Sequence, residues 1–491
     1  MMEPNTNTAV PAEPEKGSAA ARGSGFFRFA HTLSRVMTSR AACLSWLIVT
    51  CILTAIGQPI IGAMVFVWGI LVLLVFSDDV LTTTLPFLLL CVFVLPNYNS
   101  YDLFIPYWWM AIPAAVALVV HFVLYHRPVR IGKTFFGVLA VAVAVSAAGL
   151  FSGAGYSPTV IFYTISLGVG MVLAYLLIAS DLSSPREYDV AEAFSGMMIS
   201  VGFYATLLLL LLWIRELRLA GFAEMYIQPA NNLGTFLLFA LPFPLYFVWR
   251  AEGRRKLLPA FLFLLFFAAL LLSTSRGAMV MAPVLALVSL VLFAIVDEEH
   301  RRGWIVSSVV LGVVCVGAAG VALRFLVPDS PGANVFDDLS RLRLIRASML
   351  DFREYPVFGA GLAGSRNTSA YQPVAGAMRW YHMMIPQIIG SMGSVGVLAY
   401  GYQIFTRVRA YLSRIGVFSS VLLLSYFGVL FMSQVNPGEF CPLPYELLTV
   451  MLFILMERIP QNGKAPSVTS SAESAGEGNG ADALKTQGVK N

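Results

Sequence analysis

The chain has 491 residues, of which 58% are hydrophobic and 12% are charged, and its formal net charge at pH 7 is +5. A soluble protein of this size has about twice that charged fraction, so the composition excludes an ordinary soluble enzyme and indicates a membrane protein. The five cysteines are scattered, with neither metal-ligand spacing nor a disulfide framework. No nucleic-acid partner is expected, because the net positive charge is modest.

The two ends of the chain differ in composition from the segment between them. Residues 1–40 are polar up to about Ser24 and then contain three arginines, which predicts a disordered, cytoplasmic N-terminus. The tail, residues 459–491, is rich in Ser, Gly, Ala and Lys and is also expected to be disordered and cytoplasmic. Residues 41–458 are expected to form a transmembrane bundle that starts with an uncleaved helix.

Apolar runs of about 17–23 residues recur through this bundle, and each is long enough to cross a bilayer as a helix. Because lipid cannot satisfy open backbone groups, we expect an all-α, polytopic membrane helix bundle. The first two runs are short and fit either two spans or a re-entrant hairpin, so 12–14 spans are expected in total. The predicted spans are 41–57, 59–76, 80–96, 106–125, 134–150, 158–179, 190–213, 231–249, 257–273, 277–296, 304–323, 383–405, 416–434 and 440–457.

Four clusters of basic residues indicate the orientation of these spans. When the spans alternate, all four clusters and both termini fall on one face, and positive residues mark the cytoplasmic face. We therefore expect a multi-pass protein of the cytoplasmic membrane in which the long connection 324–382 is outside. The clusters are Arg127, Arg130 and Lys133; Arg250, Arg254, Arg255 and Lys256; Arg301 and Arg302; and Arg407, Arg409 and Arg414.

The external connection 324–382 contains a predicted amphipathic helix. Its apolar residues recur at three- and four-residue spacing, its start is expected near Asn334 or Asp337, and Pro356 ends it. The apolar stripe is expected to rest either on the bundle or on the lipid interface. The stripe consists of Val335, Leu339, Leu342, Ile345, Met349 and Phe352.

The same connection contains seven arginines and no lysine. Arginine without lysine indicates planar, bidentate recognition of phosphate or carboxylate. The alternative is an interfacial helix whose arginines contact lipid headgroups. The seven residues are Arg324, Arg341, Arg343, Arg346, Arg353, Arg366 and Arg379.

Further candidate residues lie at the outer ends of spans. Arg276 is held at the outer rim because almost no loop separates its two spans; the alternative is an arginine that extends to headgroups. His382 is the only histidine on the outer face, and it is either a general base or a structural residue. Asn232 is a functional or a helix-capping residue. Glu446 is a functional group or the partner of an outer arginine.

Neither a metal nor an organic cofactor is predicted. Asp337 and Asp338 form the only adjacent acidic pair outside, and no second group of ligands accompanies them. Several aromatic residues on the outer side fit either sugar stacking or an interfacial belt. They are Trp108, Trp109, Tyr371, Trp380 and Tyr381.

The motifs between about residues 225 and 405, taken in chain order, resemble those of the O-antigen ligase/polymerase family of bacterial cell-surface polysaccharide enzymes. Ser275-Arg276-Gly277 looks like the Ser-Arg-Gly signature of that family, and Asn231-Asn232 looks like its asparagine-led span. Arg341 stands fifteen residues before Pro356-Val-Phe-Gly-Ala-Gly, which is similar to another element of the family. His382 precedes a Gly-x-Leu-type span, as the histidine of the family does. Two positions depart from the family pattern: Met383 replaces the asparagine that usually follows the histidine, and Ile345 replaces the aromatic residue that usually stands four positions after the arginine.

The resemblance implies a metal-independent glycosyltransferase in which His382 is the base and Arg276 and Arg341 stabilise a diphosphate. It also implies three partners: a glycan donor on a polyprenyl diphosphate, a saccharide or a lipid or wall acceptor, and membrane lipids. The ligase and polymerase alternatives share this chemistry and stay open. The implied substrate-binding residues are Arg346, Arg343, Arg215, Arg218, Asn232, Gly359 and Gly361.

Two functions of other classes are a polytopic transporter or flippase and a non-catalytic scaffold of polysaccharide export. Transporters carry polar residues and broken helices near the membrane midplane. Here the spans are nearly free of charge and the arginines gather at the outer rim, which favours chemistry at the membrane surface.

Overall fold

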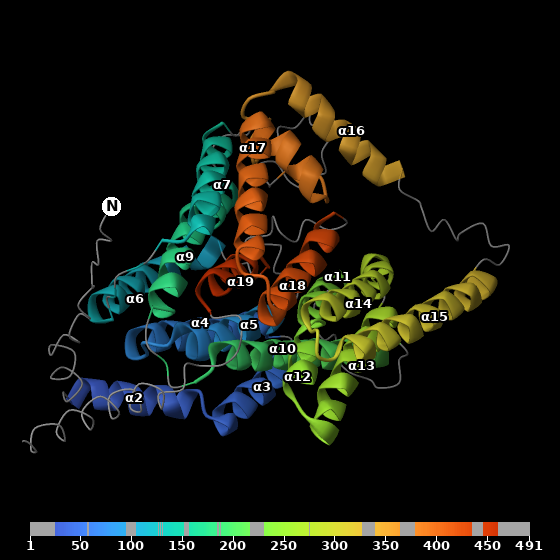
Figure 1. The fold of residues 1–491 in the computed structure, drawn as a ribbon. Helices are drawn as coiled ribbons and strands as arrows, with labels where there is room; N and C mark the ends of the chain where they lie inside the picture. Colours follow the sequence, from blue (N-terminus) through green and yellow to red (C-terminus); the bar gives the residue numbers. More distant parts are fainter. Residues whose placement is uncertain are drawn as a thin grey trace, which may run out of the picture. The chain divides into compact units, whose positions relative to one another are not determined.

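Every regular element that the structure, a computed structural model, describes is helical (Figure 1). Seven of these helices are long and apolar enough to cross a membrane, and three apolar helices are shorter. The predicted class, an all-α polytopic membrane bundle, is therefore confirmed, whereas the count of 12–14 spans stays a prediction. The described residues are 25–55, 58–94, 105–125, 127, 129, 131–151, 157–183, 186, 188–216, 230–273, 275–326, 339–363, 379–434 and 445–459.

The chain divides into two compact units, and the described residues of the first form five α-helices. His121 is buried in this unit, with Nδ1 2.7 Å from the carbonyl oxygen of Leu74. The five helices are α2 (Gly25–Met37), α3 (Arg40–Ala55), α4 (Pro59–Phe76), α5 (Leu85–Val94) and α6 (Ala111–Leu124).

Helix α2 lies within residues 1–40, where the composition suggested disorder. The rings of Phe26 and Phe29 pack against Phe76 of α4, with centroid distances of 5.6 and 5.7 Å. The average composition of 1–40 hides this aromatic pattern, so the prediction of disorder is wrong for residues 25–37.

The second unit contains the other described helices. The predicted span 158–179 is two helices joined by a π-helical turn, and the span 231–249 is two helices separated at Leu241 and Pro242. The helices are α7 (Lys133–Leu150), α8 (Pro158–Thr164), α9 (Gly170–Asp181), α10 (Val190–Glu216), α11 (Ala230–Ala240), α12 (Phe243–Arg250), α13 (Leu257–Leu271), α14 (Arg276–Val296), α15 (Arg301–Leu326), α16 (Leu339–Glu354), α17 (Met384–Leu412), α18 (Val417–Ser433) and α19 (Leu447–Arg458).

Polar contacts show which helix ends of the second unit meet. The Glu457 carboxylate accepts hydrogen bonds from the backbone N–H of Thr134 at 3.0 Å and from its hydroxyl at 2.8 Å. Arg458 donates to the Ser183 hydroxyl at 2.7 Å. The start of α7 and the ends of α9 and α19 therefore lie at one end of the unit, as the alternation of spans requires.

Helix α17 is the long central helix of this unit, with α7 beside it and α16 across it (Figure 1). A side chain on Gly137 of α7 would place Cβ 2.9 Å from the Cα atom of Gln403, so the two backbones pack closely. Helix α17 kinks at Gly393, where φ is 60° and ψ is −151°. This kink forms the place where the segment after α16 docks.

Candidate functional site

Helix α16 forms where the sequence predicts it and ends at Glu354, two residues before Pro356. Its predicted start residues, Asn334 and Asp337, lie outside the described residues. The buried face consists of Ala347, Ser348 and Asp351.

Three residues of the predicted apolar stripe of α16 do not pack on the bundle. Leu342, Ile345 and Met349 keep exposures of 60%, 39% and 45%. The bundle alternative is thus wrong for these three residues, and packing on the lipid interface stays a prediction. Arg343 and Arg346 are also exposed on this helix.

After α16 the chain folds back onto the kink of α17. The N–H of Ala360 donates to the Gly390 carbonyl at 2.8 Å, and the N–H of Ser394 donates to the Pro356 carbonyl at 2.9 Å. These bonds use backbone groups that the kink frees from the helix, so the turn and the kink complete each other.

Two glycines make this close approach possible. Gly359 has a φ of 71°, and a Cβ there would lie 2.4 Å from the backbone nitrogen of Met392. Gly393 has a φ of 60°, and a Cβ there would lie 2.5 Å from the backbone nitrogen of Gly359. Gly361 has a φ of 86°. The glycines of the Pro-Val-Phe-Gly-Ala-Gly motif therefore have a packing role, and their binding of substrate stays a prediction.

We predict that Gly359→Ala destabilises the protein by roughly 2–5 kcal/mol, because it combines a steric clash with a positive φ. The measurement is thermal unfolding in detergent. Gly401→Ala is the matched control, because Gly401 lies on α17 with no atom within 4 Å of an added Cβ. The control is expected to be neutral or to stabilise the helix. Equal melting temperatures for the two variants would contradict the packing role.

A buried polar network links α16 to the segment before α17. Asp351 accepts a hydrogen bond from the Tyr381 hydroxyl, and its carboxylate lies 3.0 Å from the Arg379 guanidinium. Gln387 holds the same segment, because its side chain donates to the Arg379 carbonyl at 2.6 Å and accepts from the Tyr381 N–H at 3.0 Å. Burial raises the pKa of Tyr381, so its hydroxyl remains a donor at neutral pH.

The sequence reasoning did not identify Asp351 or Gln387. The available signals were an acidic residue among the arginines of α16, which has only Glu354 besides, and a polar residue inside a predicted span. Tyr381 was interpreted as a sugar-stacking or interfacial residue. Both interpretations are wrong, because its side chain is fully buried. Trp380 is half-buried, and its ring centroid lies 5.8 Å from that of Tyr163. Tyr371 lies outside the described residues.

His382 follows this network and has a φ of 54°, the one positive value among non-glycine residues in the described part of the chain. Such a conformation costs about 1–2 kcal/mol and is typical of residues held in place for function. Tyr381 and Met383, its buried neighbours, fix it. Met383 is the N-cap of α17 and provides no side-chain cap, so the positive end of that helix lies next to His382.

The Ser-Arg-Gly motif begins helix α14. The Ser275 hydroxyl accepts a hydrogen bond from the Ala278 N–H at 3.4 Å, and Arg276 is the first helical residue. A Cβ on Gly234 of α11 would lie 2.8 Å from the Cβ of Ala278. Asn232 precedes Gly234 by two residues and is buried, and its carbonyl accepts from the Tyr445 hydroxyl at 3.0 Å. The starts of α11 and α14 therefore lie side by side, with Asn232 in the first turn of α11.

Helix α18 lies between two sets of predicted site residues. One set is at the starts of α11 and α14, and the other is at the start of α17, which follows His382. At its end, the amide of Gln434 lies 3.8 Å from the sulfur of Met384, the first residue of α17. A Cβ on its Gly428 would lie 2.9 Å from the Leu238 carbonyl of α11. The helix carrying Asn232 and the helix that follows His382 thus pack on the same neighbour. The side chains of Arg276, Arg341 and Arg215, and the whole of Arg218, lie outside the described part.

Glu446 has a structural partner inside the bundle. Its carboxylate lies 3.4 Å from the guanidinium of Arg407, and both side chains are 3% exposed. Arg407 also donates to the Tyr426 hydroxyl at 3.1 Å. The partner that the structure shows is thus Arg407, which was not among the arginines predicted to lie outside. Within the described ranges, no group of three His, Cys, Asp or Glu side chains is placed to hold a metal ion.

These features define a multi-pass membrane protein in which an arginine-bearing helix and the turn after it are anchored on a kinked helix. Residues 260–401 match the family model described as O-Antigen ligase, which confirms the predicted resemblance to that family. The matched segment includes Arg276, helix α16 and His382, whereas Arg215, Arg218 and Asn232 precede it. The match supports a glycosyltransferase-like role in the membrane. No curated protein matches the chain.

Proposed function

We propose that this protein transfers a glycan from a polyprenyl diphosphate donor to a saccharide or to a lipid or wall acceptor, on the outer face of the cytoplasmic membrane. The observation that carries the proposal is His382, which lies within the matched segment in a strained conformation between buried neighbours. The segment before it is tied to the arginine-bearing helix α16 through Asp351.

In the proposed reaction, the acceptor hydroxyl oxygen attacks the anomeric carbon of the donor sugar. The bond between that carbon and the diphosphate oxygen breaks, and the electron pair leaves with the polyprenyl diphosphate. His382 takes the hydroxyl proton as general base. A single displacement of this kind inverts the anomeric centre.

The charge that develops on the diphosphate requires fixed positive groups. Arg276 and Arg341 are the proposed main groups, with Arg343, Arg346, Arg215 and Arg218 assisting. Preorganised donors of this kind are worth roughly 10²–10³ in rate for each group removed. The positive end of α17, which begins directly after His382, acts in the same direction.

The exposed face of α16 fits a substrate that is both anionic and lipid-linked. Arg346 stands four residues after Leu342 and three before Met349, so the three side chains share one face of the helix. All three are exposed. A diphosphate on Arg346 would therefore lie beside apolar side chains suited to the polyprenyl chain.

We predict that Arg276→Gln and Arg341→Gln each lower the rate of glycan transfer by roughly 10²–10³-fold. Lysine at either position is expected to restore only part of the rate, because it keeps the charge but loses the bidentate geometry. The measurements are the transfer rate of purified protein and the amount of lipid-linked precursor that accumulates in cells. Arg302→Gln, an exposed arginine outside the proposed site, is the control.

Normal transfer by both glutamine variants would contradict the proposed roles of the arginines. A metal chelator is expected to leave the transfer rate unchanged. Loss of transfer on chelation, with recovery after a divalent ion is added back, would overturn the metal-independent mechanism.

A further inference from the structure

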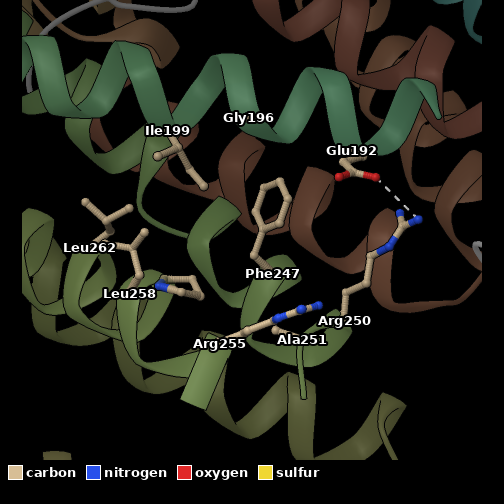
Figure 2. Close-up of a pocket in the computed structure, with 10 residues that line it drawn as sticks. Glu192, Gly196, Ile199, Phe247, Arg250, Ala251, Arg255, Leu258 and Leu262 are labelled. Atoms are coloured by element: carbon tan, nitrogen blue, oxygen red, sulfur yellow. Dashed lines mark ion pairs between the residues drawn. The ribbon is translucent and has the colours of Figure 1, made fainter. Parts of the chain in front are cut away.

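A groove of about 370 Å³ opens between α10, α12 and α13, at the opposite end of α13 from Arg276 (Figure 2). Apolar side chains from three helices form much of its wall. Polar residues lie at one side, where α12 ends and the turn before α13 begins. The lining residues are Glu192, Gly196, Ile199, Phe247, Arg250, Ala251, Arg255, Leu258, Pro259 and Leu262.

The charged side of the groove has one arginine that is balanced and one that is not. Arg250 lies 3.4 Å from the Glu192 carboxylate (Figure 2). It also lies 2.5 Å from the Asp189 carboxylate, so its charge is compensated. The Arg255 side chain is exposed, and its guanidinium makes no hydrogen bond or ion pair with any described residue. Arg254 and Lys256 flank it and Glu252 lies in the same turn, so the basic residues of this rim outnumber the acidic ones by one when Arg250, Asp189 and Glu192 are included.

The apolar part of the groove is continuous with a surface suited to lipid. Leu257, Leu258 and Phe261 at the start of α13 are 68%, 66% and 59% exposed. Gly196 leaves the backbone of α10 open to the groove, and an added Cβ there would meet no atom within 4 Å. The groove therefore has room for a hydrocarbon chain and borders an exposed apolar surface.

We propose that this groove binds an anionic phospholipid from the adjacent leaflet. The headgroup phosphate lies on Arg255, whose planar guanidinium suits bidentate contact with phosphate. An acyl chain lies along Phe247, Leu258 and Leu262, where burial of its methylene groups stabilises the complex. Basic pockets between transmembrane helices favour anionic lipid headgroups. The proposal does not depend on glycan transfer, because the groove is remote from Arg276.

The test is native mass spectrometry of the detergent-purified protein, titrated with phosphatidylglycerol, phosphatidylcholine or inorganic phosphate. Wild type is expected to retain one phosphatidylglycerol molecule, with about tenfold preference over phosphatidylcholine, as expected for a charged hydrogen bond worth at least 1.4 kcal/mol. Arg255→Gln is expected to remove this preference. Gly196→Phe fills the groove and is expected to lower the occupancy by both lipids.

Two control variants lie at another basic connection of the same unit. Gly303→Phe also adds a side chain where no atom lies within 4 Å, and Arg302→Gln removes an exposed arginine. Both are expected to bind phosphatidylglycerol as wild type does. Three outcomes would overturn the proposal: unchanged binding in both groove variants, equal binding of phosphatidylcholine by wild type, or displacement of phosphatidylglycerol by inorganic phosphate at equal concentration. If Gly196→Phe does not fold, Arg255→Gln still tests the proposal, because substitution of the exposed Arg255 side chain is expected to leave folding intact.

Discussion

His382→Asn is expected to fold normally and to transfer glycan roughly 10²–10⁴ times more slowly than wild type, the usual range for loss of a general base. Asparagine is chosen because it tolerates a positive φ better than most residues, so it preserves the backbone at 54°. It has no group that accepts a proton near neutral pH. The measurement is the initial rate of transfer to a saturating acceptor, alongside thermal unfolding.

A second variant separates the chemistry of His382 from its backbone strain. His382→Gly is expected to be at least as stable as wild type, because glycine adopts a positive φ without steric cost. Its transfer is expected to be as slow as that of the asparagine variant. Added imidazole should restore part of the rate of the glycine variant if the missing group is a base. His31→Asn, at an exposed position on α2, is the control.

Wild-type rates for His382→Asn would show that His382 is structural. Slow transfer together with a large loss of stability, and no recovery with imidazole, would lead to the same conclusion. In either case the arginine variants would still test whether the protein handles a diphosphate.

The class of fold and the position of α16 were predictable because they depend on local patterns. Long apolar runs require helices in lipid, and Pro356 sets the end of α16. The side of α16 that is buried was not predictable. Its buried residues, Ala347, Ser348 and Asp351, are small or polar, and the partner of Asp351 lies thirty residues away at Tyr381.

In the candidate site too, features that depend on local sequence were predictable and features that depend on packing were not. Motifs indicated Arg276 and His382, and the family match includes both. The strain at His382 has no local signal, because it results from packing of its neighbours rather than from its residue type. Likewise, Gly359 and Gly393 are ordinary glycines in the sequence, and only their mutual approach shows why neither position accepts a side chain.

Asp351→Asn is expected to destabilise the protein by about 3–5 kcal/mol, because it leaves the buried Arg379 guanidinium without its counter-charge. The asparagine keeps the shape of the side chain and still accepts a hydrogen bond from Tyr381. Arg379→Met is expected to cost a similar amount, since it leaves a buried carboxylate. The double variant should cost less than the sum of the two single variants by about 1–3 kcal/mol, as for residues in direct contact. Thermal and denaturant unfolding in detergent give the four stabilities.

The buried polar network around Asp351 is also expected to control the position of the α16 arginines relative to His382. If the ion pair fixes α16 against the His382 segment, the double variant recovers stability but not the fixed geometry. Its KM for the lipid-linked donor should therefore stay raised while its melting temperature partly recovers. Glu298→Gln is the control, because it breaks an ion pair with Arg301 whose side chains are 86% and 50% exposed, and such exposed pairs contribute about 0–1 kcal/mol. A loss of stability in Asp351→Asn no larger than in this control would show that the network does not hold α16 in place.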